Sequence, residues 1–210
     1  RFIAHISVNG KEEVCHVKNT GRCRELLIPN AEIYVQTNND PKRKTKFSLI
    51  AVNKGGRLIN MDSQAPNKAV EEWLKSGGLF SDIVNLKREK TFQNSRFDMY
   101  FERGGKKCFM EVKGVTLEND NVVSFPDAPS ERAVKHLKEL QIAHSMGYET
   151  YVLFIVQMSD VKYFEPNAEN HKAFAEELKQ AKASGVNILA YDCEIEPNSM
   201  VIRKPVQVLV

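Results

Sequence analysis

Two acidic residues and a lysine, placed around a Gly-Gly pair, carry the clearest chemistry in this sequence. Residues 95–115 alternate in type on either side of Gly104 and Gly105, which is a strong signal for a hairpin with a two-residue turn. With the glycines in the turn, residues whose numbers sum to 209 pair across the strands, so Asp98 is expected opposite Glu111. Side chains opposed in this way have Cβ atoms about 5 Å apart. Two carboxylates at that separation repel each other unless a cation lies between them.

A divalent-metal site is the first interpretation of this hairpin. Mg²⁺ (or Mn²⁺) binds through one or two carboxylates and keeps waters and substrate phosphates as its other ligands. Asp98 and Glu111 are therefore the predicted metal ligands. Lys113 projects from the same side of the strand, where it can orient or help deprotonate an attacking water. These three residues are the predicted catalytic group for hydrolysis of a phosphodiester.

The two faces of the hairpin differ in polarity, and this leaves an alternative open. Strand alternation places six apolar residues on the face expected to pack on the core: Phe97, Met99, Phe101, Cys108, Met110 and Val112. The opposite face carries Arg96 beside the two acids and Lys113. A surface salt-bridge ladder, in which the two cations neutralise the two acids, is the alternative to a metal site. The hairpin alone does not choose between them.

Composition and cysteine usage are those of an ordinary globular protein. Hydrophobic residues make up 42% of the 210 positions and charged residues 27%, which excludes disordered and fibrous classes. The longest apolar run, residues 151–156, is far too short to span a bilayer, so no membrane association is expected. Four scattered cysteines without a C-x-x-C pair, and a start without a signal-peptide pattern, predict reduced thiols in a cytoplasmic protein.

Positive charge is concentrated in the first third of the chain. The net charge of +3 divides into +5 over residues 1–64, with eleven Lys and Arg against six Asp and Glu, and −2 over residues 65–210, with nineteen against twenty-one. Four cations lie within one short segment: Lys42, Arg43, Lys44 and Lys46. Such a loop is suited to contacting nucleic-acid phosphates. A solvated loop that only aids solubility is the alternative.

The first 64 residues predict a small β-barrel. Strands are expected at residues 2–8, 12–17, 33–37, 47–52 and 58–61, with turns at the glycines and one short helix at 22–28. Five short strands with one helix fit a small closed barrel, for which the five-stranded OB-fold is the favoured type, and an open sheet is the alternative because it has the same pattern. An OB-fold domain is therefore expected over residues 1–64.

The pattern changes to alternating helices and strands after residue 64. Helices are expected at residues 67–75, 130–146 and 168–183, and strands at 150–157 and 186–191, with two or three more strands between 83 and 115. The almost wholly apolar strand at 150–157 should lie in the middle of a sheet. An α/β domain over residues 65–210 follows, so the fold class of the chain is mixed α/β.

Several segments along the chain resemble known proteins. An Asp in a hairpin followed by Glu-x-Lys resembles the PD-(D/E)xK nuclease superfamily, whose core is helix, three strands, helix, strand. Further segments narrow the resemblance to the sugar fermentation stimulation protein family: Asn19-Thr20-Gly21-Arg22, Ser95-Arg96-Phe97-Asp98, Glu111-Val112-Lys113-Gly114-Val115-Thr116-Leu117, Phe125-Pro126-Asp127-Ala128, Ser130-Glu131-Arg132 and Lys135-His136-Leu137. The resemblance covers nearly the whole chain in the order of the family.

The resemblance implies an N-terminal OB-fold, a C-terminal restriction-endonuclease-like domain and DNA as the partner, bound without sequence preference. The family is linked to regulation of sugar metabolism, and no reaction is firmly assigned to it. Beyond the cationic loop, the DNA-contacting candidates are Arg22, Arg96, Arg132, Lys135 and His136. Arg132 and His136 are spaced i, i+4 and share one face of a helix, for which a solvated basic face is the alternative.

Two questions stay open at the level of sequence. The first is the third metal ligand, for which Glu71, Glu72 and Glu89 are candidates. The second is the function itself: a DNA-binding protein with a Mg²⁺-dependent nuclease-like site, or a DNA-binding transcriptional regulator whose Asp-Glu-Lys set is retained for structure or phosphate docking. The sequence does not decide whether the site cleaves, whether the substrate is single- or double-stranded DNA or RNA, or which oligomer forms.

Overall fold

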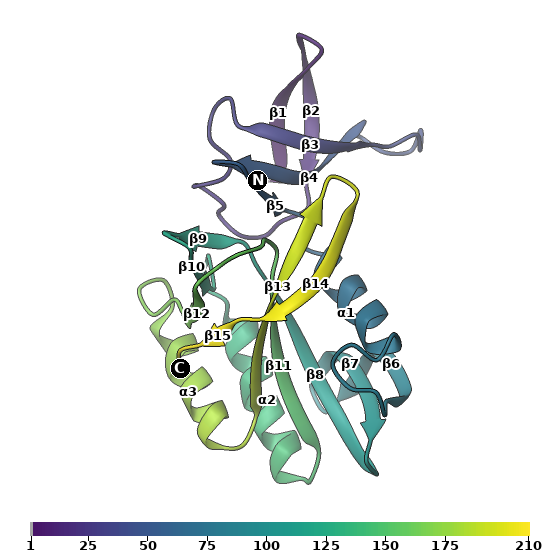
Figure 1. Ribbon diagram of the computed structural model, residues 1–210, viewed down its shortest axis with the longest axis vertical. Coiled ribbons are helices and arrows are strands. Elements are labelled where there is room, and N and C mark those ends of the chain that lie inside the picture. The colour runs from purple at the N-terminus through teal and green to yellow at the C-terminus, as the bar shows by residue number, and fades with distance from the viewer. Residues whose placement is uncertain (1) are drawn as a thin grey trace.

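The first sixty residues form a five-stranded sheet, which lies at the top of Figure 1 in the computed structural model. The structure describes residues 2–210. The strands of this sheet are β1 (Ile3–Val8), β2 (Lys11–Val17), β3 (Glu32–Thr37), β4 (Phe47–Lys54) and β5 (Arg57–Asn60). The β2–β4 pair is parallel and the other pairs are antiparallel. Cys15, Leu49 and Ile59 point inward and are buried, as the alternation of apolar residues predicts.

Two details of this domain differ from expectation. Within residues 2–210, no pairing leads from β3 or β5 back to β1, so the sheet of the OB domain is a half-barrel and remains open on one side, as the open-sheet alternative has it. Residues 24–26 form a turn and no helix lies within residues 22–28, so the predicted helix is wrong. Cys23 has a φ of 47°, and its N–H donates to Asp127 Oδ2 at 2.7 Å. A contact with a residue far along the chain therefore overrides the local helical preference.

A six-stranded sheet forms the middle of the second domain, in the order β14-β13-β11-β8-β7-β6. Its strands are β6 (Val84–Phe92), β7 (Ser95–Arg103), β8 (Lys106–Val115), β11 (Glu149–Val156), β13 (Asn187–Glu196) and β14 (Ser199–Pro205). The three central strands, β8, β11 and β13, are parallel to one another. Every residue of β11 after Glu149 is buried, which confirms the predicted central strand.

Helices cover both faces of this sheet. Helix α1 (Ala65–Lys75) packs Val70 and Leu74 into one apolar cluster. Helices α2 (Glu131–Ser145) and α3 (Lys172–Ala183) contribute to the cluster on the opposite face, which continues into the OB domain. Figure 1 shows α2 and α3 to the left of the sheet and α1 to the right. All three predicted helices are present, and α3 begins at Lys172 and not at residue 168.

A second, smaller sheet was not predicted from the sequence. It consists of β9 (Leu117–Asn119), β10 (Val122–Phe125), β12 (Tyr163–Pro166) and β15 (Gln207–Val208), in the order β15-β12-β10-β9. This sheet is joined to the OB domain by Glu118, which pairs with Lys54 at 2.6 Å and with Arg57 at 3.5 Å. The two domains are therefore held together by buried and half-buried ion pairs near the small sheet.

Two further expectations concern the cysteines and membrane-spanning helices. All four cysteines are buried and free of disulfides, in agreement with the predicted reduced thiols. Among residues 2–210, no helix has both the length and the apolar character that crossing a membrane requires.

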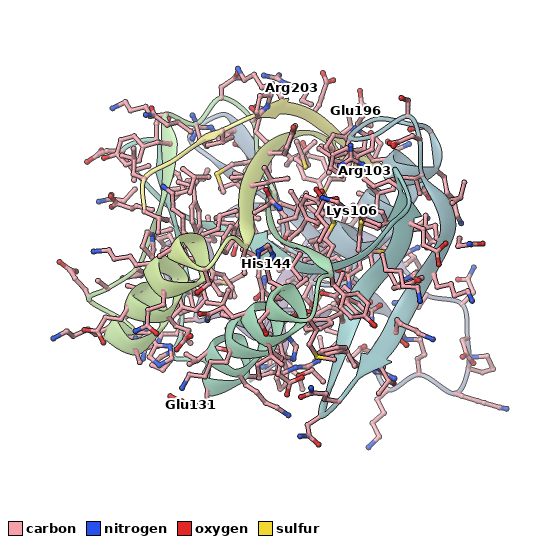
Figure 2. The ribbon with its side chains drawn as sticks, turned by 90° about the horizontal axis from the view of Figure 1, so that it is seen from below. Arg103, Lys106, Glu131, His144, Glu196 and Arg203 are labelled. Atoms are coloured by element: carbon pink, nitrogen blue, oxygen red, sulfur yellow. The ribbon has the colours of Figure 1, made fainter. Side chains whose placement is uncertain are left out.

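The β7–β8 hairpin keeps the predicted register over five pairs. These run from Met99 opposite Met110 to Arg103 opposite Lys106, so the paired numbers sum to 209. Arg103 and Lys106, which flank the glycine turn, lie close together in Figure 2. The Gly-Gly turn signal is therefore confirmed.

The hairpin departs from expectation at Phe97 and Asp98. Phe97 does not share a face with Met99 as predicted, because it packs beside Phe109 in the cluster under α2. The paired ladder ends at Met99, so Asp98 is not paired with Glu111 across the strands. Both faces of the hairpin are buried by helices, and neither forms the open polar surface that the sequence predicted.

Candidate metal centre and nucleic-acid interface

A cavity of about 480 Å³ lies where the two domains meet. Its walls come from residues 19–21 of the OB domain, from the start of α1, from β7 and β8, and from the segment that leads into α2. Asp98, Glu111 and Lys113 all line it. We call it the main cavity. The three residues that their types and spacing singled out therefore line one cavity.

Both carboxylate oxygens of Asp98 accept hydrogen bonds. Oδ1 accepts from Asn67 Nδ2 of α1 at 2.8 Å, and Oδ2 accepts from the Val112 backbone N–H at 2.8 Å. The pKa of Asp98 is nevertheless raised, chiefly by burial and then by the negative charge of Glu111, while Lys113 and the two hydrogen bonds oppose the shift. The ionised form of Asp98 is therefore unfavourable in the folded protein, and a bound cation would relieve it.

Glu111 is the most enclosed of the three residues, with 3% of its surface exposed. Its Oε1 accepts from Lys113 Nζ at 2.5 Å and contacts His136 Nδ1. Burial alone would raise the pKa of Glu111, but Lys113 and His136 outweigh it and hold the pKa below its usual range. The other oxygen, Oε2, is buried and has no hydrogen-bond partner. A buried carboxylate oxygen without a donor is costly unless a ligand such as a cation satisfies it.

A chain of contacts from α2 fixes the side chain of Glu111. His136 is 4% exposed, contacts Glu111 through Nδ1, and accepts the Nε–H of Arg132 at 3.4 Å through Nε2. An imidazole that accepts at Nε2 carries its hydrogen on Nδ1, so His136 donates to Glu111. The predicted shared face of Arg132 and His136 is therefore confirmed. Arg132 also lines the main cavity, and within residues 2–210 it forms no ion pair.

The salt-bridge ladder predicted as the alternative is present only in part. Lys113 pairs with Glu111, as that alternative requires. Arg96 instead pairs with Glu89 at 3.5 Å on the exposed surface. The reason is that the pairing of β7 with β8 ends at Met99, so Arg96 is not held beside the two acids.

A third acidic ligand does not join Asp98 and Glu111. The candidates Glu71, Glu72 and Glu89 all form ion pairs elsewhere, and none lines the main cavity. Over residues 2–210, no group of three or more His, Cys, Asp or Glu side chains is arranged to hold a metal. The available set is two carboxylates with the cations Lys113 and Arg132 in the same wall, while Asp127, a further acid of the cavity, accepts from the Cys23 N–H. This set fits Mg²⁺, which needs only one or two carboxylates and takes its remaining ligands from water and substrate.

Two polar residues of the cavity were missed in the sequence. Asn67, in the first turn of α1, donates to Asp98. Gln157, directly after β11, is 1% exposed and donates from Nε2 to Asn60 Oδ1 at 2.9 Å, which ties it to the OB domain. The sequence offers a signal for both residues. Asn67 is a polar residue at the start of the predicted helix that precedes the Asp98 strand, and Gln157 is the single amide at the end of an otherwise apolar strand.

Two segments that carried the family resemblance meet above the cavity. Asn19 Oδ1 accepts from the Gly21 N–H at 2.8 Å, and Asn19 Nδ2 donates to the Met61 carbonyl at 3.2 Å. A Cβ on Gly21 would stand 2.6 Å from Asp127 Oδ2, so only glycine fits there. Arg22, the next residue, is exposed. These contacts show that residues 19–22 and 125–128 join the two domains over the cavity.

The remaining predicted DNA contacts fall in two places. The loop cations Lys42, Arg43, Lys44 and Lys46 are exposed, lie outside the main cavity, and make no ion pair in the part of the chain from residue 2 to residue 210. The other four candidates line a separate cavity of about 480 Å³, which we call the second cavity: Arg96, Arg132, Lys135 and His136.

Comparison with known proteins finds relatives over the full length. Residues 1–61 match the SfsA N-terminal OB domain, and residues 64–199 match the sugar fermentation stimulation protein RE domain. The sugar fermentation stimulation protein homolog of Clostridium beijerinckii is 58% identical over 209 residues, which are 100% of this chain and 92% of that protein. The homolog of Desulfitobacterium hafniense is 58% identical over 200 residues, which are 95% of this chain and 87% of that protein.

A solved structure extends the comparison to three dimensions. The structure of Pyrococcus furiosus SfsA in complex with Ca²⁺ matches with a TM-score of 0.91 and 27% sequence identity. The match covers 100% of this chain and 91% of that one. Together with the domain matches, it confirms the mixed α/β fold with an N-terminal OB domain and a C-terminal α/β domain.

Proposed function

The chain belongs to the sugar fermentation stimulation protein family, and from that membership we propose that it binds DNA without sequence preference and hydrolyses phosphodiesters at a Mg²⁺ or Mn²⁺ site. The observation that carries the proposal is Glu111 Oε2, a buried carboxylate oxygen without a donor, in the same cavity as Asp98. Asp98 and Glu111 are the proposed metal ligands. Lys113 completes the proposed catalytic group.

The archaeal relative supports a divalent cation in this fold. That protein was solved in complex with Ca²⁺, and it aligns with this chain along its whole length. Ca²⁺ and Mg²⁺ both prefer oxygen ligands and differ mainly in coordination number and ligand distance. A cation held by two carboxylates is consistent with that shared ligand chemistry.

Hydrolysis of a phosphodiester needs an aligned water, neutralised charge on the scissile phosphate, and a protonated leaving oxygen. When bound, the cation supplies Lewis-acid polarisation of the phosphate. Lys113 places an ammonium group at the wall of the cavity, where it neutralises charge on the phosphate and positions the water. His136 holds Glu111 in one orientation, and Asn67 holds Asp98. The chain thus provides fixed ligands and one fixed positive charge.

A DNA-binding regulator of sugar metabolism is the second candidate. The observation that favours it is the pairing of Glu111 with both Lys113 and His136, which already neutralises the acid without a metal. In that case the Asp98-Glu111-Lys113 set stabilises the domain junction, and it docks a phosphate without cutting it. The two candidates share DNA binding and differ only in turnover.

Incubation of the purified protein with DNA tests the proposed function. Plasmid and linear single-stranded DNA are each incubated with Mg²⁺, with Mn²⁺ and with a chelator. We expect metal-dependent cleavage that the chelator stops. A Glu111→Gln protein purified in parallel should be inactive, which excludes a contaminating nuclease. Binding of DNA and metal without cleavage of any substrate would favour the regulator.

The cationic loop predicts how DNA affinity depends on salt. Each phosphate contact contributes about −0.9 to the slope of log affinity against log salt for duplex DNA. Replacing Lys42, Arg43, Lys44 and Lys46 with Ala should therefore flatten the slope by up to roughly 3.6 and weaken binding equally across sequences. Fluorescence anisotropy at several salt concentrations measures both quantities.

A matched variant removes four exposed lysines from α2 and α3: Lys138, Lys172, Lys179 and Lys182. This variant has the same net charge as the loop variant, so it separates a local contact from a general charge effect. If both variants change the slope equally, the loop is not a contact surface and the sequence-level alternative of a solubility loop holds.

A further inference from the structure

The second cavity lies next to the main cavity and is not used by the proposed metal site. Arg132 lines both cavities, so they share one wall residue. Lys135 lines the second cavity one turn further along the same helix face, and Ser95 and Arg96 line it from the start of β7. The second cavity therefore combines residues from three of the segments that carried the family resemblance.

Ser95, which lines this cavity, has an unsatisfied hydroxyl. Its surface is 6% exposed, and its Oγ is buried without a hydrogen-bond partner. A hydroxyl can donate one hydrogen bond and accept two, so a buried one without any partner costs free energy in the folded protein. An acceptor group in the second cavity would satisfy the Ser95 hydroxyl.

The cations around the second cavity are only weakly neutralised. Arg132 has no carboxylate partner within residues 2–210. Lys135 donates to the Asn94 carbonyl at 2.7 Å and lies 3.7 Å from Glu139. Arg96 has only its pair with Glu89 on the exposed surface, and such pairs contribute little.

The one acid that lines this cavity already has a partner outside the lining. Glu131 Oε1 lies 3.1 Å from His171 Nε2, between α2 and the start of α3. Glu131 lies at the edge of the molecule in Figure 2. The second cavity therefore presents three cations and a free hydroxyl, a set that matches a phosphate group.

We propose that the second cavity is a phosphate subsite, which holds the phosphate next to the one in the main cavity along a single nucleic-acid strand. Ser95 donates its hydroxyl, and Arg132 and Lys135 supply charge. The guanidinium of Arg132 presents N–H groups in two directions, so it can contact both successive phosphates. The identification of the ligand as a nucleic acid rests on the proposed function. The subsite itself requires neither metal nor cleavage.

Binding without divalent metal tests the subsite. Short DNA strands with a 5′-phosphate or a 5′-hydroxyl are titrated, in chelator, against wild type, Ser95→Ala and Arg132→Gln. We expect Ser95→Ala to weaken binding by about fivefold and Arg132→Gln by about tenfold or more. Ser95→Ala removes an unsatisfied buried group, so its melting temperature without ligand should stay the same or rise. That result separates a lost contact from misfolding.

Comparison of the 5′-phosphate and 5′-hydroxyl DNA strands identifies which phosphate the subsite binds. A loss seen only with the 5′-phosphate strand assigns the subsite to a chain end, and an equal loss with both strands assigns it to an internal phosphate. Lys138→Gln is the matched control, since Lys138 lies on the same helix but pairs with Glu177 of α3. Wild-type affinity in both Ser95→Ala and Arg132→Gln would overturn the subsite, and so would an equal loss in Lys138→Gln.

A second measurement tests the subsite independently of the proposed function. If wild type binds no DNA, the proposed function fails, and titration with inorganic phosphate still decides the subsite. NMR signals of the residue-95 amide and the Arg132 Nε–H should then shift in wild type, and Ser95→Ala should need about five times more phosphate for the same shift. Absence of any shift at these two positions overturns the subsite, whatever the outcome of the cleavage assay.

Discussion

Lys113→Ala is expected to lower the rate of DNA cleavage by about a hundred- to a thousand-fold while DNA and metal binding stay nearly unchanged. The reason is that Lys113 lines the cavity as a positive charge and is not a carboxylate ligand. A fixed charge that stabilises the transition state changes turnover more than ground-state binding. Cleavage rates at saturating metal and DNA measure the effect, and calorimetry measures the two binding constants.

Lys113 has a second contact, which the test must separate from catalysis. Its Nζ pairs with Glu111, so Lys113→Ala also removes one of the two groups that lower the pKa of Glu111. Lys113→Gln keeps a hydrogen-bond donor near Glu111 without the charge and should be almost as inactive. Lys106→Ala, on an exposed lysine of the same strand, is the control that should cleave normally. Cleavage by Lys113→Ala at the wild-type rate would remove Lys113 from the catalytic group.

The elements that the sequence predicted well are those with a long and consistent pattern. Strand β11 is apolar throughout, and its place in the middle of the sheet follows because both faces must be covered. The register of the β7–β8 hairpin follows from Gly104 and Gly105, since a two-residue turn leaves only one pairing. Local chemistry determines these features.

The elements that were missed depend on distant contacts. Residues 22–28 have a helical pattern, but Cys23 gives its N–H to Asp127 of the other domain. The strands of the small sheet have at most four residues each, which is too short for a pattern to show. Phe97 leaves its predicted face because aromatic neighbours on the other face accept it. None of these causes is visible within a window of neighbouring residues.

The candidate site divides in the same way. Asp98, Glu111 and Lys113 were found because their spacing around one turn brings them near each other. The groups that orient them come from helices elsewhere in the chain, Asn67 for Asp98 and His136 for Glu111. The spacing of Arg132 and His136 predicted their shared helix face, but nothing in it indicated Glu111 as the partner. These contacts form only when α1 and α2 pack on the sheet, so the local sequence does not predict them.

Mg²⁺ or Mn²⁺ is expected to raise the melting temperature of the wild type, and Asp98→Asn to abolish that rise. A ligand that binds only the folded state at one hundred times its dissociation constant stabilises it by about 2.7 kcal/mol. For a protein of this size the melting temperature then increases by roughly 5–10 °C. Asp98→Asn should change the metal-free protein less, because it removes an unfavourable buried charge but leaves Asn67 and the Val112 N–H with one good acceptor between them.

The metal-induced rise in melting temperature should depend on pH in a way that distinguishes this buried site from a surface site. The pKa of Asp98 is raised, so in the metal-free protein the folded state loses stability as the pH rises through the pKa of an ordinary aspartate, and this penalty is complete above the raised pKa and absent at low pH. A cation binds the ionised form and relieves the penalty. The metal-induced rise should therefore be full above the raised pKa of Asp98 and shrink, as the pH falls, sooner than for an ordinary aspartate. Asp82→Asn, at an exposed acid paired with Arg103, is the control and should keep the full rise. An equal rise in wild type and Asp98→Asn would show that the cation binds elsewhere, and the metal assignment of this cavity would then be lost.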